Sequence, residues 1–378
     1  MPWEKKTVEE QRKAFVAAAE NKEGSVSVLC REYGISRKTG YKWIKRAEKG
    51  QPLTDASRIP KRQPGKTPDG VEQLILEMRA AHPTWGGRTI RQVLENQGQK
   101  ELPCARTCDR ILSRNGCIDK EESAKHKAFQ RFERSTSNEL WQADFKGDFL
   151  LKDGTRCYPL TTLDDHSRYC IQIRAKEKTT NIKEDFIRIF KEYGLPDALL
   201  TDNGAQFSGF RGGYTQFERF LMDLDVEPIH GRIWHPQTQG KIERFHRTMK
   251  QEILRDPPAD MKDAQKRFDE WRWLYNEVKP HSALKMKPPS SAYQPSSKLY
   301  HSPVAFVYPP GSRVVKVNNW GYLRFGPIQL FLSETMKDTY LEIRPTEHDT
   351  IWVIYRNFRI AVIDPFQKKL LNRTIRRL

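Results

Sequence analysis

The sequence predicts a multidomain fold with three kinds of part: all-α helix-turn-helix units at the N-terminus, an α/β core in the middle and a small β-barrel at the C-terminus. Three observations support this prediction. Apolar residues recur at helical spacing up to residue 118, short strand-like runs alternate with helices between 138 and 278, and apolar and polar residues alternate after residue 304. A chain of 378 residues is also too long for one ordinary core.

The net charge of +18 is unevenly distributed. Residues 1–137 hold 28 basic and 18 acidic side chains, residues 138–300 hold 26 and 24, and residues 301–378 hold 12 and 6. Two basic flanks around a nearly neutral middle indicate a polyanionic partner held by the flanks, although a basic surface that serves only solubility is the simpler alternative. No run of 18 apolar residues occurs, so we expect a cytoplasmic protein without a membrane span or signal peptide.

The first unit, residues 1–50, is predicted to hold helices over 8–19, 25–32 and 37–46. Gly34 suits the tight turn before the last of these helices, and Ser36 is a good N-cap for it. A helix, a short turn and a basic helix are typical of a helix-turn-helix motif whose second helix enters the major groove. A plain helical hairpin with solvated charges is the alternative. The residues expected to face DNA are Arg37, Lys38, Lys42 and Lys45.

A basic, proline-rich linker over residues 51–68 leads to a second unit, residues 69–118. Helices are expected over 71–82, 87–97 and 105–114, and Arg106, Arg110 and Arg114 recur at four-residue spacing along the last helix. We therefore predict a second helix-turn-helix domain in which Arg106 and Arg110 contact DNA, with a three-helix spacer as the alternative. A charged connector is expected over residues 119–137.

The core is assigned to residues 138–278. Strands are expected over 140–145, 157–163, 169–173, 198–201 and 226–229, and helices over 181–193, 215–224 and 241–254. This order predicts a layered α/β fold with a mixed sheet. Residues 279–303 are proline-rich and predicted to be extended. Residues 304–378 are expected to form the small β-barrel, with a basic tail.

Three carboxylates stand where this pattern would bring them together. Asp144 lies at the end of the first core strand, Asp202 follows the fourth, and Glu243 is in the first turn of the long helix. Hard oxygen ligands of this kind suit Mg²⁺ or Mn²⁺, and two such ions would activate the attacking oxygen and stabilise the leaving one in phosphodiester cleavage. Taken singly, each residue has an ordinary explanation as a strand-end cap, a turn residue or a first-turn helix acid.

These residues and their neighbours resemble the signatures of integrase-core (rve-type) DDE insertion-sequence transposases, which are related to retroviral integrase. The segment 275–284 resembles the end of that core, and residues 30–43 resemble the helix-turn-helix of one subgroup. The signatures are Trp141-x-x-Asp144, Thr201-Asp202-Asn203-Gly204 with Phe207, and His235-Pro236-Gln237-Thr238-Gln239-Gly240-Lys241-Ile242-Glu243-Arg244-Phe245-His246-Arg247.

The resemblance implies an RNase H-like core in which Asp144, Asp202 and Glu243 are the catalytic residues and hold two Mg²⁺ ions, with Mn²⁺ able to substitute. It implies strand hydrolysis at transposon terminal inverted repeats and joining of the 3′-hydroxyl to target DNA. Arg247 and Lys250 lie one and two helical turns after Glu243 and could hold DNA-end phosphates. The 40 residues between Asp202 and Glu243 exceed the common spacing, which suggests a loop insertion near 209–213.

The partners implied are double-stranded DNA, both transposon ends and target, and further copies of the chain in a dimer or larger assembly, at the bacterial nucleoid. The six cysteines form no CxxC pair, so we predict reduced thiols and no structural zinc. Two alternatives remain open: a catalytically inactive, domesticated DNA-binding repressor of the same fold, and an RNase H-like nuclease without strand transfer.

Overall fold

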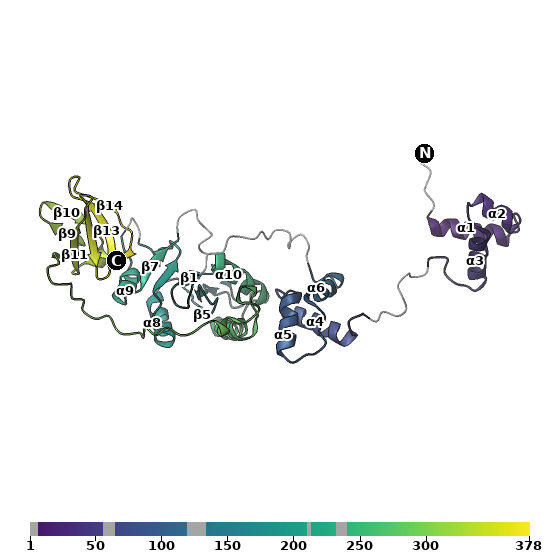
Figure 1. The fold of residues 1–378 in the computed structure, drawn as a ribbon, viewed down its shortest axis with the longest axis horizontal. Helices are drawn as coiled ribbons and strands as arrows, with labels where there is room; N and C mark the ends of the chain where they lie inside the picture. The colour runs from purple at the N-terminus through teal and green to yellow at the C-terminus, as the bar shows by residue number, and fades with distance from the viewer. Residues whose placement is uncertain (1–6, 56–64, 119–133, 210–212, 232–239) are drawn as a thin grey trace. The chain divides into compact units, whose positions relative to one another are not determined.

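A computed structural model describes residues 7–55, 65–118, 134–209, 213–231 and 240–378 (Figure 1). The chain divides into two compact units, residues 1–66 and 67–378. Among the described residues, no helix combines the length and the apolar character needed to cross a membrane. The predicted connector over 119–137 falls mostly outside the described residues, as do residues 210–212 of the insertion expected near 209–213.

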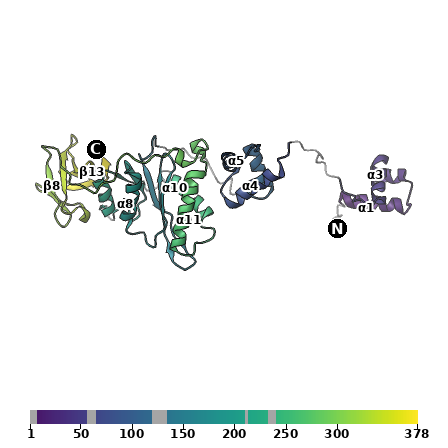
Figure 2. The same cartoon turned by 90° about the horizontal axis from the view of Figure 1, so that it is seen from below.

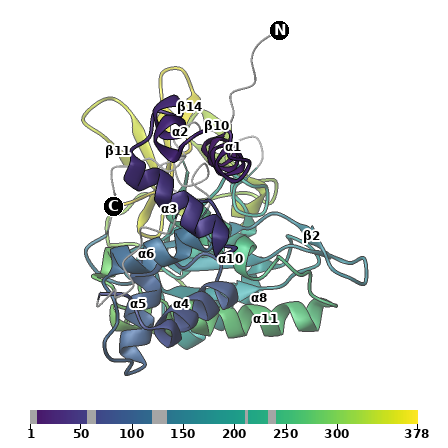
Figure 3. The ribbon, with the colours of Figure 1, turned by 90° about the vertical axis from the view of Figure 1, so that its right-hand side faces the viewer.

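The first unit is a cluster of three helices (Figures 1 and 3). The predicted Ser36 N-cap is confirmed, since its hydroxyl accepts a hydrogen bond from the Thr39 backbone amide. Phe15, Leu29, Cys30 and Trp43 are buried between the helices, which leaves the basic side chains on the outside. The helices are α1 (Val8–Glu20), α2 (Val26–Glu32) and α3 (Arg37–Glu48).

Gly40 sets how closely α3 approaches the other two helices. A Cβ atom at this position would lie 2.4 Å from the Cys30 sulfur and 3.0 Å from the Phe15 ring. Contacts this short do not occur between real atoms, so any side chain at this position would push α3 away from the core that positions it.

The second group of helices packs around Ile75, Trp85, Ile90 and Leu112, all almost fully buried. The backbone amide of Gly87 donates a 2.8 Å hydrogen bond to the Asp109 carboxylate, which ties the start of one helix to the next. These helices match the predicted ranges closely: α4 (Asp69–Ala81), α5 (Gly87–Asn96) and α6 (Ala105–Arg114).

A five-stranded mixed sheet forms the centre of the second unit, in the order β5-β4-β1-β6-β7. Strand β1 pairs antiparallel with β4 and parallel with β6, and β6 pairs parallel with β7. The predicted α/β layered core is therefore confirmed. Its strands are β1 (Trp141–Phe145), β4 (Leu160–Asp164), β5 (Cys170–Arg174), β6 (Ala198–Thr201) and β7 (Glu227–His230).

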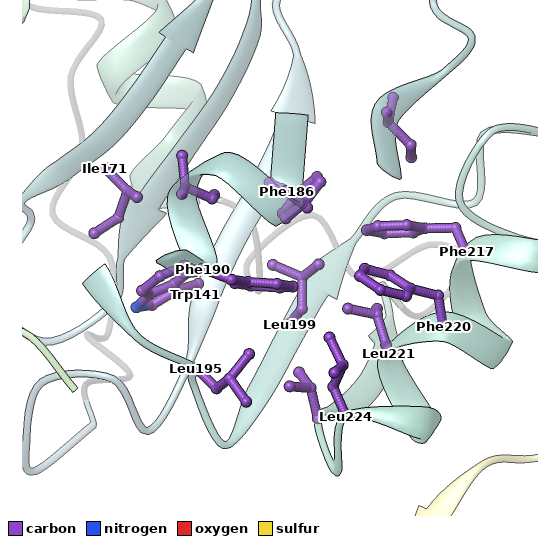
Figure 4. Close-up of a cluster of buried hydrophobic side chains, with 14 of the residues drawn as sticks. Trp141, Ile171, Phe186, Phe190, Leu195, Leu199, Phe217, Phe220, Leu221 and Leu224 are labelled. Atoms are coloured by element: carbon purple, nitrogen blue, oxygen red, sulfur yellow. The ribbon is translucent and has the colours of Figure 1, made fainter. Parts of the chain in front are cut away.

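Helices cover both faces of this sheet, as Figure 2 shows with the sheet between α8 on one side and α10 and α11 on the other. On the first face, α8 (Ile182–Tyr193) and α9 (Gln216–Asp223) bury aromatic side chains such as Phe186 and Phe217 against Trp141 and Leu199 (Figure 4). On the second face, α10 (Gly240–Glu252) and α11 (Met261–Trp273) pack through Phe245 and Phe268. The sheet is thus fixed from both sides.

Two elements of the core were not predicted. Helix α11 has few apolar residues, and only Ala264, Phe268 and Trp271 are buried, so its pattern is weak. A small hairpin of β2 (Phe149–Leu150) and β3 (Arg156–Cys157) also precedes β4. After α11 the chain continues in a π-helical turn over Leu274–Val278 and in short 3₁₀ turns over Ser282–Leu284 and Pro289–Ser291.

The C-terminal part is β-rich, but the closed barrel is not confirmed. Its main sheet runs β14-β13-β12-β11-β8 with β15 beside β13, and β9 and β10 form a separate hairpin, so the hydrogen-bonded sheets are open. The strands are β8 (Val314–Lys316), β9 (Tyr322–Phe325), β10 (Ile328–Phe331), β11 (Tyr340–Pro345), β12 (Ile351–Tyr355), β13 (Phe358–Asp364), β14 (Lys369–Asn372) and β15 (Arg376–Arg377), with a 3₁₀ turn at Glu334–Met336.

This sheet is docked on the core around α9. Tyr214 and Met222 are buried with the apolar residues of the sheet, and the Tyr214 hydroxyl donates a 2.6 Å hydrogen bond to the Ile360 carbonyl. The Tyr355 hydroxyl donates a 2.5 Å bond to Asp223, and Arg377 forms an ion pair with Asp225. Buried apolar contacts and charge-assisted bonds together join the two parts.

We predict that Gly40→Ala destabilises the first unit by about 1–3 kcal/mol, because the added methyl group overpacks the helix crossing. Gly70→Ala is a matched control, since Gly70 lies in α4 with no atom within 4 Å of the added carbon. Hydrogen exchange of the α3 amides in the full chain measures the effect. Equal exchange in Gly40→Ala and in the wild type would show that the crossing is not tightly packed.

Candidate active site

The pairing of β1 with β6 places two of the three predicted carboxylates side by side. In the parallel register Trp141 lies opposite Leu199 and Gln142 opposite Leu200. Two residues further along each strand the same register reaches Asp144 and Asp202. Neighbouring strands lie about 4.8 Å apart, so both side chains belong to one edge of the sheet. The predicted strand-end positions are confirmed.

The alternation along β1 decides which face Asp144 occupies. Trp141 and Ala143 pack with the α8 side, so Gln142 and Asp144 point to the α10 side. On that side the Asp144 carboxylate lies 3.7 Å from the His246 ring in α10. Glu243 lies three residues before His246 on the same helix, and residues three apart share a helix face. The structure therefore brings all three carboxylates to one region.

Their electrostatic interaction is visible at Asp144. The pKa of its carboxyl is raised to about 7, first by burial, with the negative charges of Asp202 and Glu243 also raising it. A carboxyl group that is held near two others resists ionisation in this way, and a bound cation would relieve the repulsion. In the described part of the chain, however, no three His, Cys, Asp or Glu side chains lie close enough together to hold a metal ion as they stand.

His246 and Thr161 hold Asp144 in place. The Thr161 hydroxyl donates a 2.9 Å bond to the Asp144 carbonyl, so the His246 Nε2, 2.7 Å away, is the donor to that hydroxyl oxygen. Burial, with the charge of Lys146 acting in the same direction, lowers the pKa of His246 to about 3. The 3.7 Å contact to Asp144 is therefore made by a neutral imidazole through Nδ1 and is not an ion pair.

The start of α10, next to Glu243, is tied to the sheet by a buried ion pair. The Lys241 ammonium lies 2.6 Å from the Asp165 carboxylate, which is 1% exposed, and also donates to the Asp165 carbonyl. The Gln142 side chain donates a 2.7 Å bond to the other carboxylate oxygen. Breaking such a buried pair typically costs about 3–5 kcal/mol, so this contact strongly fixes where α10 begins.

The other end of α10 is held by Glu252, which is almost fully buried. Lys279 lies 3.1 Å from its carboxylate, and the Trp271 indole donates a 2.6 Å bond to it. The Thr84 hydroxyl, between α4 and α5, also donates to Glu252. Burial lowers the pKa of Lys279, while Glu252 opposes that effect. The second group of helices therefore shares polar contacts with the helix that carries Glu243.

Basic side chains gather on the second half of α10 and just after Asp144. Arg247 and Lys250 are exposed on α10 and line a cavity of about 640 Å³ together with Pro83, Gln251, Leu254 and Arg255. Burial and the charge of Lys250 lower the pKa of Lys146, which lies two residues after Asp144. A concave surface with several cations beside carboxylates suits a phosphate-bearing ligand.

The remaining predicted DNA-contact residues are all exposed: Arg37, Lys38, Lys42 and Lys45 on α3, and Arg106 and Arg110 on α6. Arg114, the third arginine on the α6 face, pairs instead with Glu72 of α4. His235 and the first part of the third signature, up to residue 239, lie outside the described residues.

The sequence analysis assigned no role to His246 and missed Thr161 and the pair of Lys241 with Asp165. One signal was available for His246. It lies three residues after Glu243 between the apolar positions Phe245 and Met249, which puts it at the buried edge of the helix face. Nothing in the sequence indicated that Thr161 lies opposite Asp144, because this depends on the antiparallel register of β1 and β4.

Comparison with known protein families agrees with this geometry. Two models described as "Integrase core domain" match residues 134–236 and 224–289. A "Helix-turn-helix domain" model matches residues 11–62, and a "Homeodomain-like domain" model matches residues 39–112. The central part of the chain is an integrase core domain, preceded by helix-turn-helix sequence.

Curated proteins give the same assignment. The chain is 28% identical over 193 residues to the transposase for transposon Tn552 of Staphylococcus aureus, covering 43% of this chain and 39% of that protein. It is 29% identical over 150 residues to the Gag-Pro-Pol polyprotein of sheep pulmonary adenomatosis virus, covering 39% and 7%. The matched region spans between 6% and 39% of the length of these and two further viral relatives.

Among solved structures, the HTLV-2 integrase catalytic core domain in complex with magnesium has 18% sequence identity and a TM-score of 0.33, covering 42% of this chain and 98% of that one. The sequence matches show that residues 134–289 are similar to the integrase core of rve-type transposases and integrases.

We predict that Thr161→Val and His246→Asn each lower Mg²⁺-dependent DNA cleavage by about 10–100-fold, because both variants lose the bonds that hold the backbone of Asp144, the proposed metal ligand, and outer contacts of a metal site have effects of this size. The loss should appear chiefly as a higher Mg²⁺ requirement. Thr162→Val is the matched control, since the neighbouring Thr162 hydroxyl accepts a bond from Gln172 instead. Unchanged Mg²⁺ dependence in both test variants would exclude a role for these residues in positioning Asp144.

We predict that Asp144→Asn stabilises the protein at pH 8. Because the pKa of Asp144 is raised above its unfolded value, the folded state binds the extra proton, and this contribution to stability is lost as pH rises toward 7 and above. The stability difference between variant and wild type should therefore shrink from pH 8 to pH 4. Thermal unfolding across this range measures it, with Asp349→Asn on an exposed turn as the control. A stability difference between variant and wild type that does not change with pH would contradict the raised pKa of Asp144.

Proposed function

We propose that this protein is a DNA transposase. It binds the terminal inverted repeats of its element, hydrolyses a strand at each end and joins the freed 3′-hydroxyl to target DNA. The observation that carries the proposal is the convergence of Asp144 and Asp202, at the ends of paired strands, with Glu243 on the facing helix. The integrase-core match and the similarity to a transposase support it.

The donor set fits a divalent metal. Three carboxylates supply hard oxygen ligands of the kind that Mg²⁺ and Mn²⁺ prefer. Burial and the charges of Asp202 and Glu243 raise the pKa of Asp144, against the opposing charge of Lys146, and a bound cation would favour the ionised carboxylate. We propose that Asp144, Asp202 and Glu243 would hold two Mg²⁺ ions. When bound, the metal would supply activation of the attacking oxygen and stabilisation of the leaving oxygen.

The other residues position the carboxylates and the DNA. His246 and Thr161 hold the backbone of Asp144, and the pair of Lys241 with Asp165 fixes the start of the helix that carries Glu243. Arg247, Lys250 and Lys146 would hold the phosphates of the DNA end beside the site, since they lie near the carboxylates on an open basic surface. Orientation of this kind can contribute several kcal/mol to a phosphoryl-transfer reaction.

The helix-turn-helix parts would direct the protein to particular DNA sequences. Exposed basic residues on α3 and α6 suit two separate contacts with DNA, one for each unit. Joining two element ends to one target requires both ends together, so we propose a homo-oligomer, dimer or larger, assembled on DNA. The catalytically inactive repressor remains the alternative.

We predict that the wild-type protein nicks a labelled duplex that carries its own terminal repeat in Mg²⁺, and that Asp202→Asn lowers this cleavage by at least about 10³-fold while duplex binding persists. Asp202 lies at a strand end outside the buried core, so the amide should not disturb folding.

A pre-cut end and a target plasmid test joining separately from cleavage. Nicking without joining would identify a nuclease. Binding without cleavage by either protein, in Mg²⁺ or Mn²⁺, would support the repressor instead of the transposase.

A further inference from the structure

The residue before Asp202 is anchored on the face of the sheet that α8 and α9 cover. Thr201 lies opposite His230 in the parallel register of β6 and β7, on the same face as Leu199. The Thr201 hydroxyl oxygen lies 3.2 Å from the His230 Nδ1, and Thr201 is 3% exposed. Because side chains alternate along a strand, Asp202 is directed to the opposite face, where its charge acts on Asp144.

Glu218 in α9 holds the imidazole of His230 from its other side. The His230 Nε2 lies 2.8 Å from one carboxylate oxygen of Glu218. The second oxygen accepts hydrogen bonds of 2.6 and 2.9 Å from the amide and hydroxyl of Thr215, the N-cap of α9. A carboxylate can only accept hydrogen bonds, so Nε2 donates to Glu218 and this bond directs Nδ1 at Thr201.

The position of Glu218 does not depend on His230. Its neighbours Phe217 and Phe220 are buried in the apolar layer of α8 and α9 (Figure 4). Their rings lie 4.8 Å from Phe186 and 6.3 Å from Phe190, measured between centroids. Since Glu218 is also only 3% exposed, α9 provides a fixed anchor, and His230 connects this anchor to the end of β6.

The turn that carries Asp202 is tied to the residue after His230. The Gly231 amide donates a 3.0 Å hydrogen bond to the Thr201 carbonyl, and the Asn203 side chain donates a 3.0 Å bond to the Gly231 carbonyl. The Gly204 amide in turn donates a 3.0 Å bond to the Asp202 carboxylate. The backbone on both sides of Asp202 is therefore held at the end of β7.

We propose that His230 is a positioning residue for Asp202. Through its bonds to Glu218 and Thr201 it fixes the end of β6 and the following turn, and this turn holds the Asp202 carboxylate in one orientation toward a divalent cation. Thr201 is buried, so the Glu218, His230 and Thr201 series positions the strand end and does not perform nucleophilic attack. The proposal rests on the proposed function for the identification of Asp202 as a metal ligand.

Mn²⁺ binding to the full chain, followed by electron paramagnetic resonance, tests this role without DNA. Thr201→Val and His230→Phe should each weaken Mn²⁺ binding by about tenfold, because outer contacts of a metal site have effects of this size. The double variant should bind about as weakly as either single variant, since both remove the same contact. His230→Asn should restore part of the affinity, because its side-chain oxygen can replace Nδ1 as the partner of Thr201.

Tyr355→Phe is the matched control and should bind Mn²⁺ like the wild type. It removes the hydrogen bond to Asp223 of the same helix, but leaves the contacts of His230 in place. Hydrogen exchange of the Gly204 amide gives a second measurement, because this amide donates to Asp202. Exchange should be faster in Thr201→Val and His230→Phe and unchanged in Tyr355→Phe.

Two results would overturn the proposal: wild-type Mn²⁺ affinity in both Thr201→Val and His230→Phe, or equal losses in these variants and in Tyr355→Phe. The second result would assign the effect to the packing of α9. Failure of the proposed function is distinguishable, because a wild-type protein that binds no Mn²⁺ would overturn the metal site itself. Wild-type Mn²⁺ binding with unchanged affinity in the two test variants overturns this inference alone.

Discussion

The parallel pairing of β1 with β6 is the constraint on which the rest of the site depends. It fixes Asp144 beside Asp202 through backbone hydrogen bonds, before any side chain contributes. Two-residue alternation then turns Asp144 toward α10, and the buried pair of Lys241 with Asp165 sets where that helix begins. A slip of one residue in this register would point Asp144 at the apolar α8 layer, so apolar packing of the sheet and catalytic geometry are determined together.

The same arrangement concentrates negative charge in one region, which is electrostatically unfavourable. Three carboxylates are brought together, one of them largely buried, and the raised pKa of Asp144 reflects this. The neutral His246 does not relieve the charge; through Thr161 it holds the backbone carbonyl of Asp144. The cations nearby, Lys146 and Lys250, stand on the approach to the site, where a phosphate backbone would pass. The proposed division between positioning residues and phosphate-binding residues is one that phosphodiester chemistry requires.

Much of this could be predicted from the sequence, because the relevant signals were local. Helix periodicity, the Ser36 N-cap and the alternation of strands with helices gave elements close to those observed, and the three acidic residues stood at element ends. The resemblance to integrase-core transposases added the prediction that these three residues form one site. Thr161 and Asp165 escaped prediction because their roles follow from pairing between distant strands. Helix α11 was not predicted because few of its residues are apolar. The prediction of a closed barrel was wrong because alternating apolar and polar residues predict strands but do not show whether the sheet closes on itself.

The central claim is that Asp144, Asp202 and Glu243 form one divalent-cation site, and Mn²⁺ binding followed by electron paramagnetic resonance tests it most directly. The account predicts that Asp144→Asn, Asp202→Asn and Glu243→Gln each weaken Mn²⁺ binding by at least about tenfold, and that any two together cost little more than one, because residues of one site are strongly coupled. Wild-type binding by Glu243→Gln, or independent and additive losses from the three substitutions, would contradict it.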